Sequence, residues 1–466
     1  MNKKILLVLF FAFIIRLIAL NQSLWLDEAV TAKVVMNYSF FDIVSRFSPT
    51  DFHPPLYYLF MKIWTNAFGY SEISLRLPSV MFSLLTGYLV YLIGKKIKNT
   101  ETGFWAMIFF LFNPLIVYYS QEARIYMMAV FLLSVATFLL ININYLKDQV
   151  ESSNVKSQMS KMSRLQFKTL NFRLVSLFSI FITLSFLTFY GSIFLIAAFL
   201  LYLIFKKEYS AVIISGLTLS IAMIFIWPLF SQQLANSKLS LQIVANWPMV
   251  LGTANLKNLL LIPMKFAFGR ISFYPKYLYW LLAGCWTAVV WIFITKGILK
   301  NRWLGFILLF PLTAAFIFSF STPLLQYFRF IYLIPIASLL ISLAVKSIWL
   351  KKVLAGIFLG LSLVYLLLPI FHREDWKSLG ASIPAQSEVN VIIPSADALK
   401  YYRKDLILED LRGIETTVNF KNEFLIIPYT SEIYGFDYKK ILLKNNYTLV
   451  NAETFRGVFY ELWQKK

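Results

Sequence analysis

Residues 173–205 read RLVSLFSIFITLSFLTFYGSIFLIAAFLLYLIF, a mostly apolar run that breaks at Tyr190 and Gly191. A helix needs about 20 mostly apolar residues to cross the hydrocarbon core of a bilayer. The run therefore predicts two consecutive spans that are joined by a tight turn at Tyr190–Gly191. This single stretch places the chain among the polytopic membrane proteins.

Similar runs recur on both sides of this stretch and together predict eleven membrane spans. They cover residues 5–21, 75–94, 103–119, 125–145, 173–189, 191–205, 211–230, 277–295, 303–320, 328–345 and 352–371. The composition agrees, because 59% of the residues are hydrophobic and only 14% are charged, whereas a soluble domain is about one quarter charged. It excludes a soluble enzyme, a disordered chain, a disulfide scaffold and a nucleic-acid binder. No small-x-small cleavage site follows the first run, so we expect this run to stay as an anchor.

The loop charges predict the orientation, because basic residues gather on the cytoplasmic side of membrane proteins. A cytoplasmic N-terminus would give the cytoplasmic segments a net charge of +15, out of +21 for the whole chain. An odd number of spans would then leave the C-terminus on the extracytoplasmic side of a plasma-membrane protein. The polar stretch at residues 147–168 belongs to these segments and is expected to be a linker or an interfacial helix.

The tail, residues 372–466, differs from the membrane part, residues 1–371, because it has 13 basic and 13 acidic residues. Short apolar segments in the tail predict strands, and amphipathic segments between them predict helices. The strands are VNVIIP, EFLIIPYT and GVFYELW, and the helices are SADALKYYRK and DYKKILLKNNY. We also expect a helix at WKSLGASI, with Trp376, Leu379 and Ile383 on one face. The tail is therefore predicted to be a small extracytoplasmic α/β domain.

The first outer loop, residues 22–74, contains two adjacent carboxylates, Asp27 and Glu28, just after the first span. Charged groups beside an apolar boundary are costly and often functional. The alternative is that Asp27 caps a helix and that Glu28 lies in its first turn. Arg16, inside the first span, is expected to extend its side chain to the membrane interface.

The same loop continues with Asp51-Phe52-His53-Pro54-Pro55-Leu56-Tyr57-Tyr58. The two prolines predict the start of a helix. Asp51 and His53 are two residues apart on an extended segment, so their side chains should point the same way. Oxygen and imidazole ligands suit a divalent cation. Alternatively, Asp51 caps the helix and His53 is a surface residue.

Two more outer loops contain candidate ligands. In residues 113–126, Glu122 and Arg124 form either an interfacial salt bridge or a site for a sugar and a phosphate. In residues 321–330, Arg329 precedes the tenth span. An arginine at headgroup depth can pair bidentately with a phosphate, and the alternative is an interfacial arginine without a ligand.

These motifs resemble those of the integral-membrane glycosyltransferases of the C superfold (GT-C). Within that group, the chain is most similar to relatives of the protein O-mannosyltransferases and of the lipid A aminoarabinose transferase. The resemblance rests on Trp25-Leu26-Asp27-Glu28-Ala29, His53-Pro54-Pro55-Leu56-Tyr57-Tyr58, Ser71 to Ser79, Ser120-Gln121-Glu122-Ala123-Arg124 and Arg329-Phe330. It is clear over residues 20–145 and is limited to layout in the later spans.

The resemblance implies an inverting hexosyl- or pentosyltransferase that moves a sugar from a polyprenyl-phosphate carrier to a hydroxyl of an acceptor at the outer face. It implies catalytic roles for Asp27 and Glu28, and a divalent cation (Mg, Mn, Ca or Zn) at Asp51 and His53, with no organic cofactor. The implied substrate-binding residues are Tyr57, Arg76, Glu122, Arg124 and Arg329. The partners would be the lipid-linked donor, the acceptor and the bilayer, but no nucleic acid.

Two alternatives stay open at this point. A lipid-linked sugar flippase would need polar residues deep within the spans. An oligosaccharide ligase or polymerase would use a diphosphate donor, and such enzymes rely on arginines and a histidine in a large outer loop. The identity of the sugar and of the acceptor (lipid, glycan or protein) and the oligomeric state cannot be deduced from the sequence.

Overall fold

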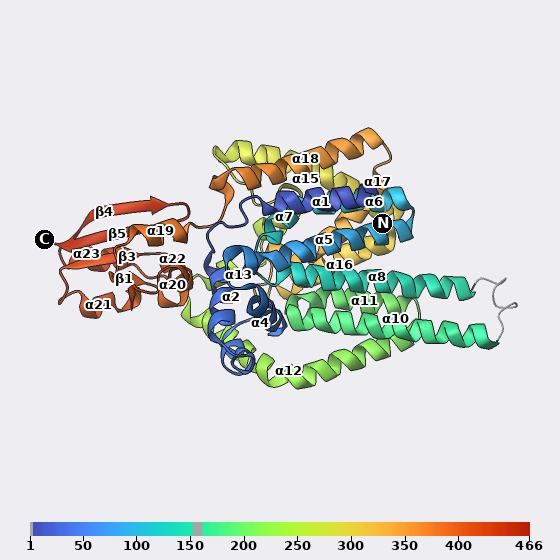
Figure 1. Ribbon diagram of the computed structural model, residues 1–466, viewed down its shortest axis with the longest axis horizontal. Coiled ribbons are helices and arrows are strands. Elements are labelled where there is room, and N and C mark those ends of the chain that lie inside the picture. Colours follow the sequence, from blue (N-terminus) through green and yellow to red (C-terminus); the bar gives the residue numbers. More distant parts are fainter. Residues whose placement is uncertain (1–2, 152–160) are drawn as a thin grey trace.

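The computed structural model describes residues 3–151 and 161–466 and consists of a long helical bundle with a sheet at one end (Figure 1). Residues 376–465, which contain this sheet, are called the sheet region below. The bundle end that contacts it is called the sheet end, and the other is called the opposite end. The N-terminal helix begins toward the opposite end, and the C-terminus lies at the tip of the sheet region (Figure 1).

The helices of the bundle follow one another with short connections. They are α1 (Lys3–Leu17), α2 (Leu26–Asn37), α3 (Phe40–Asp42), η1 (Ile43–Phe47), η2 (Ser48–Thr50), α4 (Leu56–Phe68), α5 (Glu72–Ile97), α6 (Thr100–Leu111), α7 (Pro114–Ser120), α8 (Tyr126–Glu151), α10 (Lys161–Thr188), η3 (Tyr190–Ser192), α11 (Ile193–Phe205), α12 (Tyr209–Ile243), α13 (Trp247–Leu251), α14 (Leu256–Phe268), α15 (Lys276–Lys300), α16 (Arg302–Phe318), η4 (Tyr327–Leu333), α17 (Ile334–Ala344), α18 (Ile348–Leu367) and η5 (Pro369–Phe371). The middle of the stretch predicted as a linker or interfacial helix, residues 152–160, lies outside the described residues.

All eleven apolar runs coincide with helices, but the described residues contain only seven helices that are long and apolar enough to cross a membrane. An eighth span results if α6 and α7, which bend by 62° at their junction, are counted together. The remaining three runs fall on α1, α11 and α16, which are shorter. The helical membrane fold is therefore confirmed, whereas the number of eleven spans and the orientation of the termini stay predictions.

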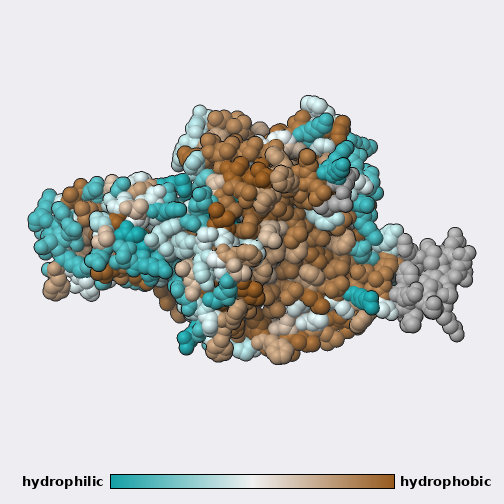
Figure 2. All heavy atoms as spheres, viewed as in Figure 1, coloured by the Kyte–Doolittle hydropathy of each residue, from teal (hydrophilic) through white to brown (hydrophobic). Residues whose placement is uncertain are grey.

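The outer surface of the bundle carries a wide apolar belt (Figure 2). Large side chains are exposed on it, and Phe225 of α12 is 84% exposed. Only 6% of the apolar window of α12 is buried inside the protein. Exposed apolar area of this extent marks a surface that contacts other molecules rather than water, and its place on long apolar helices indicates lipid.

The interior of the bundle is held by close helix packing at the opposite end. A Cβ atom on Gly103 of α6 would lie 2.2 Å from the Tyr91 carbonyl oxygen of α5, and one on Gly94 would lie 2.7 Å from Gly103 Cα. Small residues at these positions let the two helices approach closely. This contact fixes α6, and with it the bend from which α7 and the loop after it extend to the sheet end.

Arg16 lies at this bend and does not reach the interface as expected. Its side chain is fully buried and donates hydrogen bonds to the carbonyl oxygens of Ala12 (2.8 Å) and Leu111 (2.6 Å). Leu111 is the last residue of α6, whose final carbonyl groups have no partner within the helix. The free carbonyl group at the helix break attracts the guanidinium inward, which the sequence of α1 alone does not reveal.

At the sheet end, two helices, α2 and the amphipathic α4, connect the first span to the second. α4 begins at Leu56, directly after Pro54 and Pro55, as predicted. The segment before it is held by Gln233 of α12, whose side-chain amide donates to the carbonyl oxygens of Ser48 (2.7 Å) and His53 (2.9 Å).

The sheet region contains a mixed five-stranded sheet in the order β2-β1-β3-β5-β4 among the described residues. Its elements are α19 (Trp376–Ser382), β1 (Glu388–Val391), η6 (Ile393–Ser395), α20 (Asp397–Tyr402), β2 (Ile407–Asp410), η7 (Leu411–Gly413), α21 (Ile414–Thr417), β3 (Glu423–Ile427), α22 (Ser431–Tyr434), α23 (Tyr438–Lys444), β4 (Tyr447–Phe455) and β5 (Val458–Lys465). The three predicted strands are β1, β3 and β5, and the predicted helices are α19, α20 and α23. The sequence did not predict β2 and β4, because these two edge strands are largely exposed and carry only short apolar runs.

The sheet region docks on α2 through apolar and polar contacts. Trp376 and Leu379 of α19 and Ile383, which directly follows this helix, are buried as predicted and share one apolar cluster with Ala29 of α2. Lys33 of α2 forms an ion pair of 3.1 Å with Asp397. Further hydrogen bonds join Leu24 N to Tyr402 Oη (2.8 Å) and Tyr401 Oη to the Tyr70 carbonyl oxygen (2.8 Å). The helix that carries Asp27 and Glu28 is therefore fixed between the bundle and the sheet region.

Candidate active site at the sheet end

Glu28 and Arg76 form a fully buried ion pair at the sheet end. Arg76 Nε and Nη2 donate to the two carboxylate oxygens of Glu28 at 2.8 and 2.5 Å. The other N–H groups of Arg76 donate to the carbonyl oxygens of Leu20, Gln22 and Ser23. Glu28 also accepts a hydrogen bond of 2.8 Å from the backbone N–H of Ala123. An arginine has five N–H donors, and all five are used here. Because Glu28 also binds the backbone of Ala123, this pair connects the first and second outer loops.

Asp27 points away from that pair, toward Arg124. Its Oδ2 atom lies 3.4 Å from Arg124 Nη2, and its side chain is 35% exposed whereas that of Arg124 is 6% exposed. The residue that caps α2 is Trp25, without a side-chain hydrogen bond. Asp27 therefore does not cap the helix, and its carboxylate is open to a ligand on one side.

The spacing of Asp51 and His53 predicts that they point the same way, and their side chains lie close together. His53 Nδ1 lies 3.4 Å from Asp51 Oδ1, and Asp51 Oδ2 is buried without a hydrogen-bond partner in the described part of the chain. Burial alone would raise the pKa of the Asp51 carboxyl, but the charge and hydrogen bond of His53 and the charge of Arg124 outweigh it and lower this pKa. Asp51 does not cap α4, which begins at Leu56.

Glu122 does not pair with Arg124 but with Arg373, which lies between α18 and α19. Arg373 Nη2 and Nε donate to Glu122 Oε1 at 2.6 and 3.1 Å. The pKa of Glu122 is raised above its ordinary value, because the effect of burial exceeds the opposite effect of the nearby Arg373 guanidinium. The sequence reasoning missed Arg373, which is 251 positions from Glu122. The run His372-Arg373-Glu374-Asp375 directly after the last span is the one signal that could have drawn attention to it.

Two more arginines at this end have no salt-bridge partner among the described residues. Arg329 Nη1 donates to the Pro323 carbonyl oxygen at 3.2 Å. Arg270, in the connection between α14 and α15, donates to Tyr118 Oη at 2.6 Å. The sequence reasoning identified Arg329 but missed Arg270, because a lone arginine after a helix has no distinctive pattern.

Tyrosines link these groups into one cluster. Tyr126 is close enough to interact electrostatically with Asp27, Glu122, Arg124 and Arg329, and its ring lies 5.6 Å from that of Phe328. Tyr119 interacts in the same way with Glu122 and Arg270. The loops at residues 22–74, 113–126 and 321–330 therefore converge at the sheet end, together with the 269–275 connection and Arg373.

Several buried polar atoms of these loops have no hydrogen-bond partner in the described structure. They include Trp25 Nε1, Asp51 Oδ2, Tyr57 Oη, Tyr58 Oη, Gln121 Oε1, Glu122 Oε2 and Arg124 Nε. Buried polar groups in native proteins are nearly always satisfied. Such a concentration of unpaired donors and acceptors is expected where a polar ligand completes the hydrogen bonding.

The donors offered to a metal ion are few. The described residues contain no group of three or more His, Cys, Asp and Glu side chains that could hold a cation. Asp51 and His53 supply two ligands, and the unpaired Asp51 Oδ2 is compatible with a cation. A divalent ion would therefore need further oxygens from water or from a ligand.

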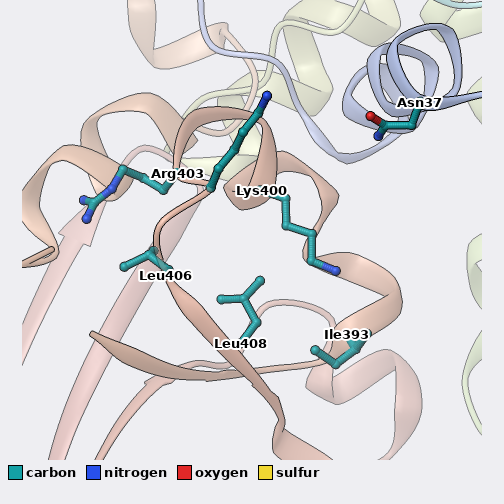
Figure 3. A pocket seen from close by; sticks show the side chains of 7 residues that line it. Asn37, Ile393, Lys400, Arg403, Leu406 and Leu408 are labelled. Atoms are coloured by element: carbon teal, nitrogen blue, oxygen red, sulfur yellow. The ribbon is translucent and has the colours of Figure 1, made fainter. Parts of the chain in front are cut away.

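A separate hollow of about 530 Å³ lies between the sheet region and the end of α2 (Figure 3). It is lined by Asn37, Ile393, Lys400, Arg403, Lys404, Leu406 and Leu408. Arg403 is engaged in hydrogen bonds with Asp405 (2.8 Å). None of the predicted site residues lines this hollow, so we do not include it in the candidate active site.

A family model described as dolichyl-phosphate-mannose-protein mannosyltransferase matches residues 52–150. No curated protein sequence matches the chain. The matched segment includes His53, Tyr57, Glu122 and Arg124, and it begins one residue after Asp51.

Solved structures match nearly the whole chain. ArnT from Cupriavidus metallidurans bound to undecaprenyl phosphate has a TM-score of 0.57 and 11% identity, with 98% of this chain and 97% of ArnT covered. The oligosaccharyltransferase AglB from Archaeoglobus fulgidus, in complex with an inhibitory peptide and a dolichol-phosphate, has a TM-score of 0.51 and 11% identity, with 98% of this chain and 74% of AglB covered. An oligosaccharyltransferase of the same organism in complex with Zn and sulfate has a TM-score of 0.50 and 11% identity, with 97% and 72% covered.

The resemblance predicted from the sequence is therefore confirmed. Residues 52–150 match the dolichyl-phosphate-mannose-protein mannosyltransferase model, and the chain as a whole shares its fold with ArnT and AglB. At such low identity the structural likeness concerns the fold alone.

Proposed function

We propose that the protein is a glycosyltransferase that moves a sugar from a polyprenyl-phosphate-linked donor to a hydroxyl group of an acceptor, with inversion. The observation that carries this proposal is the difference in exposure among the four candidate acids of the outer loops. Glu28, Asp51 and Glu122 are at most 14% exposed, whereas Asp27 is 35% exposed and has one distant basic partner. Asp27 is therefore the carboxylate best placed to act on a substrate.

In this proposal Asp27 is the general base. It takes the proton of the acceptor hydroxyl while the hydroxyl oxygen attacks the anomeric carbon and the bond from that carbon to the phosphate oxygen breaks. Arg124, 3.4 Å from Asp27 Oδ2, orients the carboxylate. Attack from the side opposite the leaving phosphate would invert the anomeric configuration.

The leaving group is a lipid phosphate, whose negative charge grows as the bond breaks. Arg329 and Arg270 have no salt-bridge partner in the described chain, so their charges are available to a phosphate. The names of the similar structures agree, since ArnT was solved with undecaprenyl phosphate and AglB with a dolichol-phosphate. In this proposal the lipid tail would lie against the apolar belt of the bundle.

Glu28 and Arg76 take a positioning role in the proposal instead of the catalytic and substrate-binding roles implied by the resemblance. Every N–H of Arg76 and both oxygens of Glu28 are already bonded within the protein. Tyr57 and Glu122 keep their substrate-binding roles, because Tyr57 Oη and Glu122 Oε2 are buried and unpaired in the described structure. They would bond to sugar hydroxyl groups.

A divalent cation, if bound, would be held by Asp51 and His53 and would neutralise phosphate charge. Support for this part comes from the unpaired Asp51 Oδ2 and from the related oligosaccharyltransferase solved with Zn. The ion could be Mg, Mn, Ca or Zn.

We further propose that residues 1–371 form the membrane domain and residues 372–466 an extracytoplasmic domain, with the N-terminus in the cytoplasm of a plasma-membrane protein. The basic residues that face the opposite end support this orientation. A flippase would need polar groups along a path between the two ends, whereas the cluster of acids and arginines lies at one end.

The test is the replacement Asp27→Asn, with Asp42→Asn as the matched control. Asp42 lies in the same outer loop, where it pairs with Arg46, outside the cluster. Purified protein would be given labelled polyprenyl-phosphate sugars together with native membranes as the acceptor source. We expect Asp27→Asn to lose sugar transfer with unchanged thermal unfolding, and Asp42→Asn to keep it.

Two results would count against the proposal. Transfer at the unaltered rate by Asp27→Asn would remove Asp27 from the chemistry. Consumption of polyprenyl-diphosphate sugars in place of the monophosphate donors would favour the ligase or polymerase alternative.

A further inference from the structure

Arg373 lies in the segment that connects the bundle to the sheet region, between η5 and α19, and its side chain extends into the candidate active site. Its guanidinium donates twice to Glu122 Oε1, at 2.6 and 3.1 Å. The same group lies 3.7 Å from the centre of the Trp25 ring and 5.1 Å from that of Tyr118. The side chain is 13% exposed, so both its charge and its plane are fixed by the surrounding bundle.

The backbone of Arg373 is held from the opposite direction, by the turn between β4 and β5. Arg456 Nε donates to the Arg373 carbonyl oxygen at 2.6 Å, and Asp375 N donates to the Arg456 carbonyl oxygen at 2.8 Å. Gly457 in this turn has a φ of +72°, and a Cβ there would lie 3.1 Å from Glu374 Cγ. The turn thus lies directly against residues 373–375.

These contacts determine which part of Glu122 is free. Oε1 is occupied by Arg373, whereas Oε2 is buried and without a partner in the described chain. The charged groups that face Glu122 are Arg373, Glu28 and Arg270. Arg373 is the only one of these that hydrogen bonds to the Glu122 side chain in the described residues, and it comes from outside the helical bundle.

We propose that Arg373 is a positioning residue that holds Glu122 with Oε2 directed to the sugar, and that the β4–β5 turn holds Arg373 in place through Arg456. The candidate site is therefore incomplete without the sheet region, which acts on the reaction through this connection. The inference rests on the proposed function in so far as transfer is measured. In this inference the sheet region does not simply cover the site but helps to position Glu122 within it.

The test compares four variants in the full-length protein: Arg373→Ala, Arg373→Lys, Arg456→Ala and the control Arg412→Ala. Arg412 is another arginine of the sheet region, and it pairs with Asp410 at 2.5 Å at the surface. Loss of a charge-assisted hydrogen bond corresponds to a rate loss of about 10- to 100-fold. We expect a loss of this size for Arg373→Ala, a smaller one for Arg373→Lys and Arg456→Ala, and none for Arg412→Ala.

A role in positioning an ionised Glu122 also predicts a change in pH dependence. Burial raises the pKa of Glu122 and Arg373 lowers it, so the Arg373→Ala variant should have a still higher pKa. Because the ionised form is the active one, transfer should be lost as the pH falls, and the acidic limb should move to higher pH in Arg373→Ala. A merely structural role would lower the rate without moving this limb.

A second measurement does not depend on transfer. The infrared band of the protonated carboxyl that Glu122→Gln removes should persist to higher pH in Arg373→Ala than in the unaltered protein. An unmoved band, or an unmoved pH profile with an unchanged rate, would overturn the role of Arg373. An Arg456→Ala variant that behaves like Arg412→Ala would overturn the role of the turn. If the unaltered protein transfers no sugar while the band still moves, the proposed function fails and the positioning of Glu122 stands.

Discussion

The two ends of the bundle use charge in different ways. At the sheet end, acids and arginines are buried and meet in pairs that join distant segments, such as Glu28 with Arg76 and Glu122 with Arg373. At the opposite end, basic residues are mostly exposed, and a prominent ion pair there, Lys351 with Glu101, has a carboxylate that is 58% exposed. Close helix packing at Gly94 and Gly103 holds that end instead.

This difference separates charges that determine how a protein lies in the membrane from charges that build a site. Exposed basic residues act through their number and their side of the membrane. Buried pairs act through geometry, since a buried charge without its partner is strongly unfavourable. The contrast between the two ends therefore predicts three effects of decreasing size.

The largest effect is expected from Arg76→Ala. The change leaves the Glu28 carboxylate buried without its partner, and it also removes the donors to three backbone carbonyl groups. Breaking one side of a buried ion pair costs about 3–5 kcal/mol. Denaturant titration in mixed micelles should show this loss in the free energy of unfolding. A loss below about 1 kcal/mol would contradict the structural role of this pair.

Replacing Gly103 by alanine should have an intermediate effect at the opposite end. The added Cβ would lie 2.2 Å from the Tyr91 carbonyl oxygen, so α5 and α6 must move apart, at a cost of about 1–3 kcal/mol. Gly284→Ala in α15 is the matched control, because nothing lies within 4 Å of its added Cβ. The midpoint temperature of thermal unfolding should fall for Gly103→Ala and should stay level or rise for Gly284→Ala. Equal shifts for the two variants would show that packing does not hold this end.

The smallest effect is expected from Glu101→Gln. The pair with Lys351 is short, at 2.6 Å, and the Lys351 side chain is only 6% exposed, but the Glu101 side chain is 58% exposed. The amide oxygen of the replacement glutamine still offers the Lys351 amino group an acceptor, and water reaches this side of the pair. Exposed ion pairs contribute about 0–1 kcal/mol. The free energy of unfolding should therefore change by less than about 1 kcal/mol, and the rate of sugar transfer should not change. A loss as large as that of Arg76→Ala would erase the distinction between the two ends.

The fold was largely predictable because each element carries its own signal. Every apolar run became a helix, and the three residues that the periodicity around α19 selected are buried. The exceptions have identifiable causes. The edge strands β2 and β4 are largely exposed and carry only short apolar runs, and Arg16 turns inward to a carbonyl group of another helix.

The candidate site was predictable only as a set of residues. Asp27, Asp51, Glu122, Arg124 and Arg329 are conspicuous as polar side chains in outer loops of an apolar chain. The pairing within the set was not predictable, as Glu122 shows, since its partner is Arg373 and not the nearby Arg124. Arg270 had no sequence signal at all.

The sequence by itself determined that this is a helical membrane protein with polar loops rich in acids and a small α/β tail, because hydropathy and periodicity act over a single turn or span. Only the tertiary structure decided which carboxylate stays accessible, which arginines stay unpaired and that the tail contributes Arg373 to the site. Those properties depend on contacts across 48 and 251 positions. Such contacts are set by how the helices pack, and a linear pattern does not encode them locally.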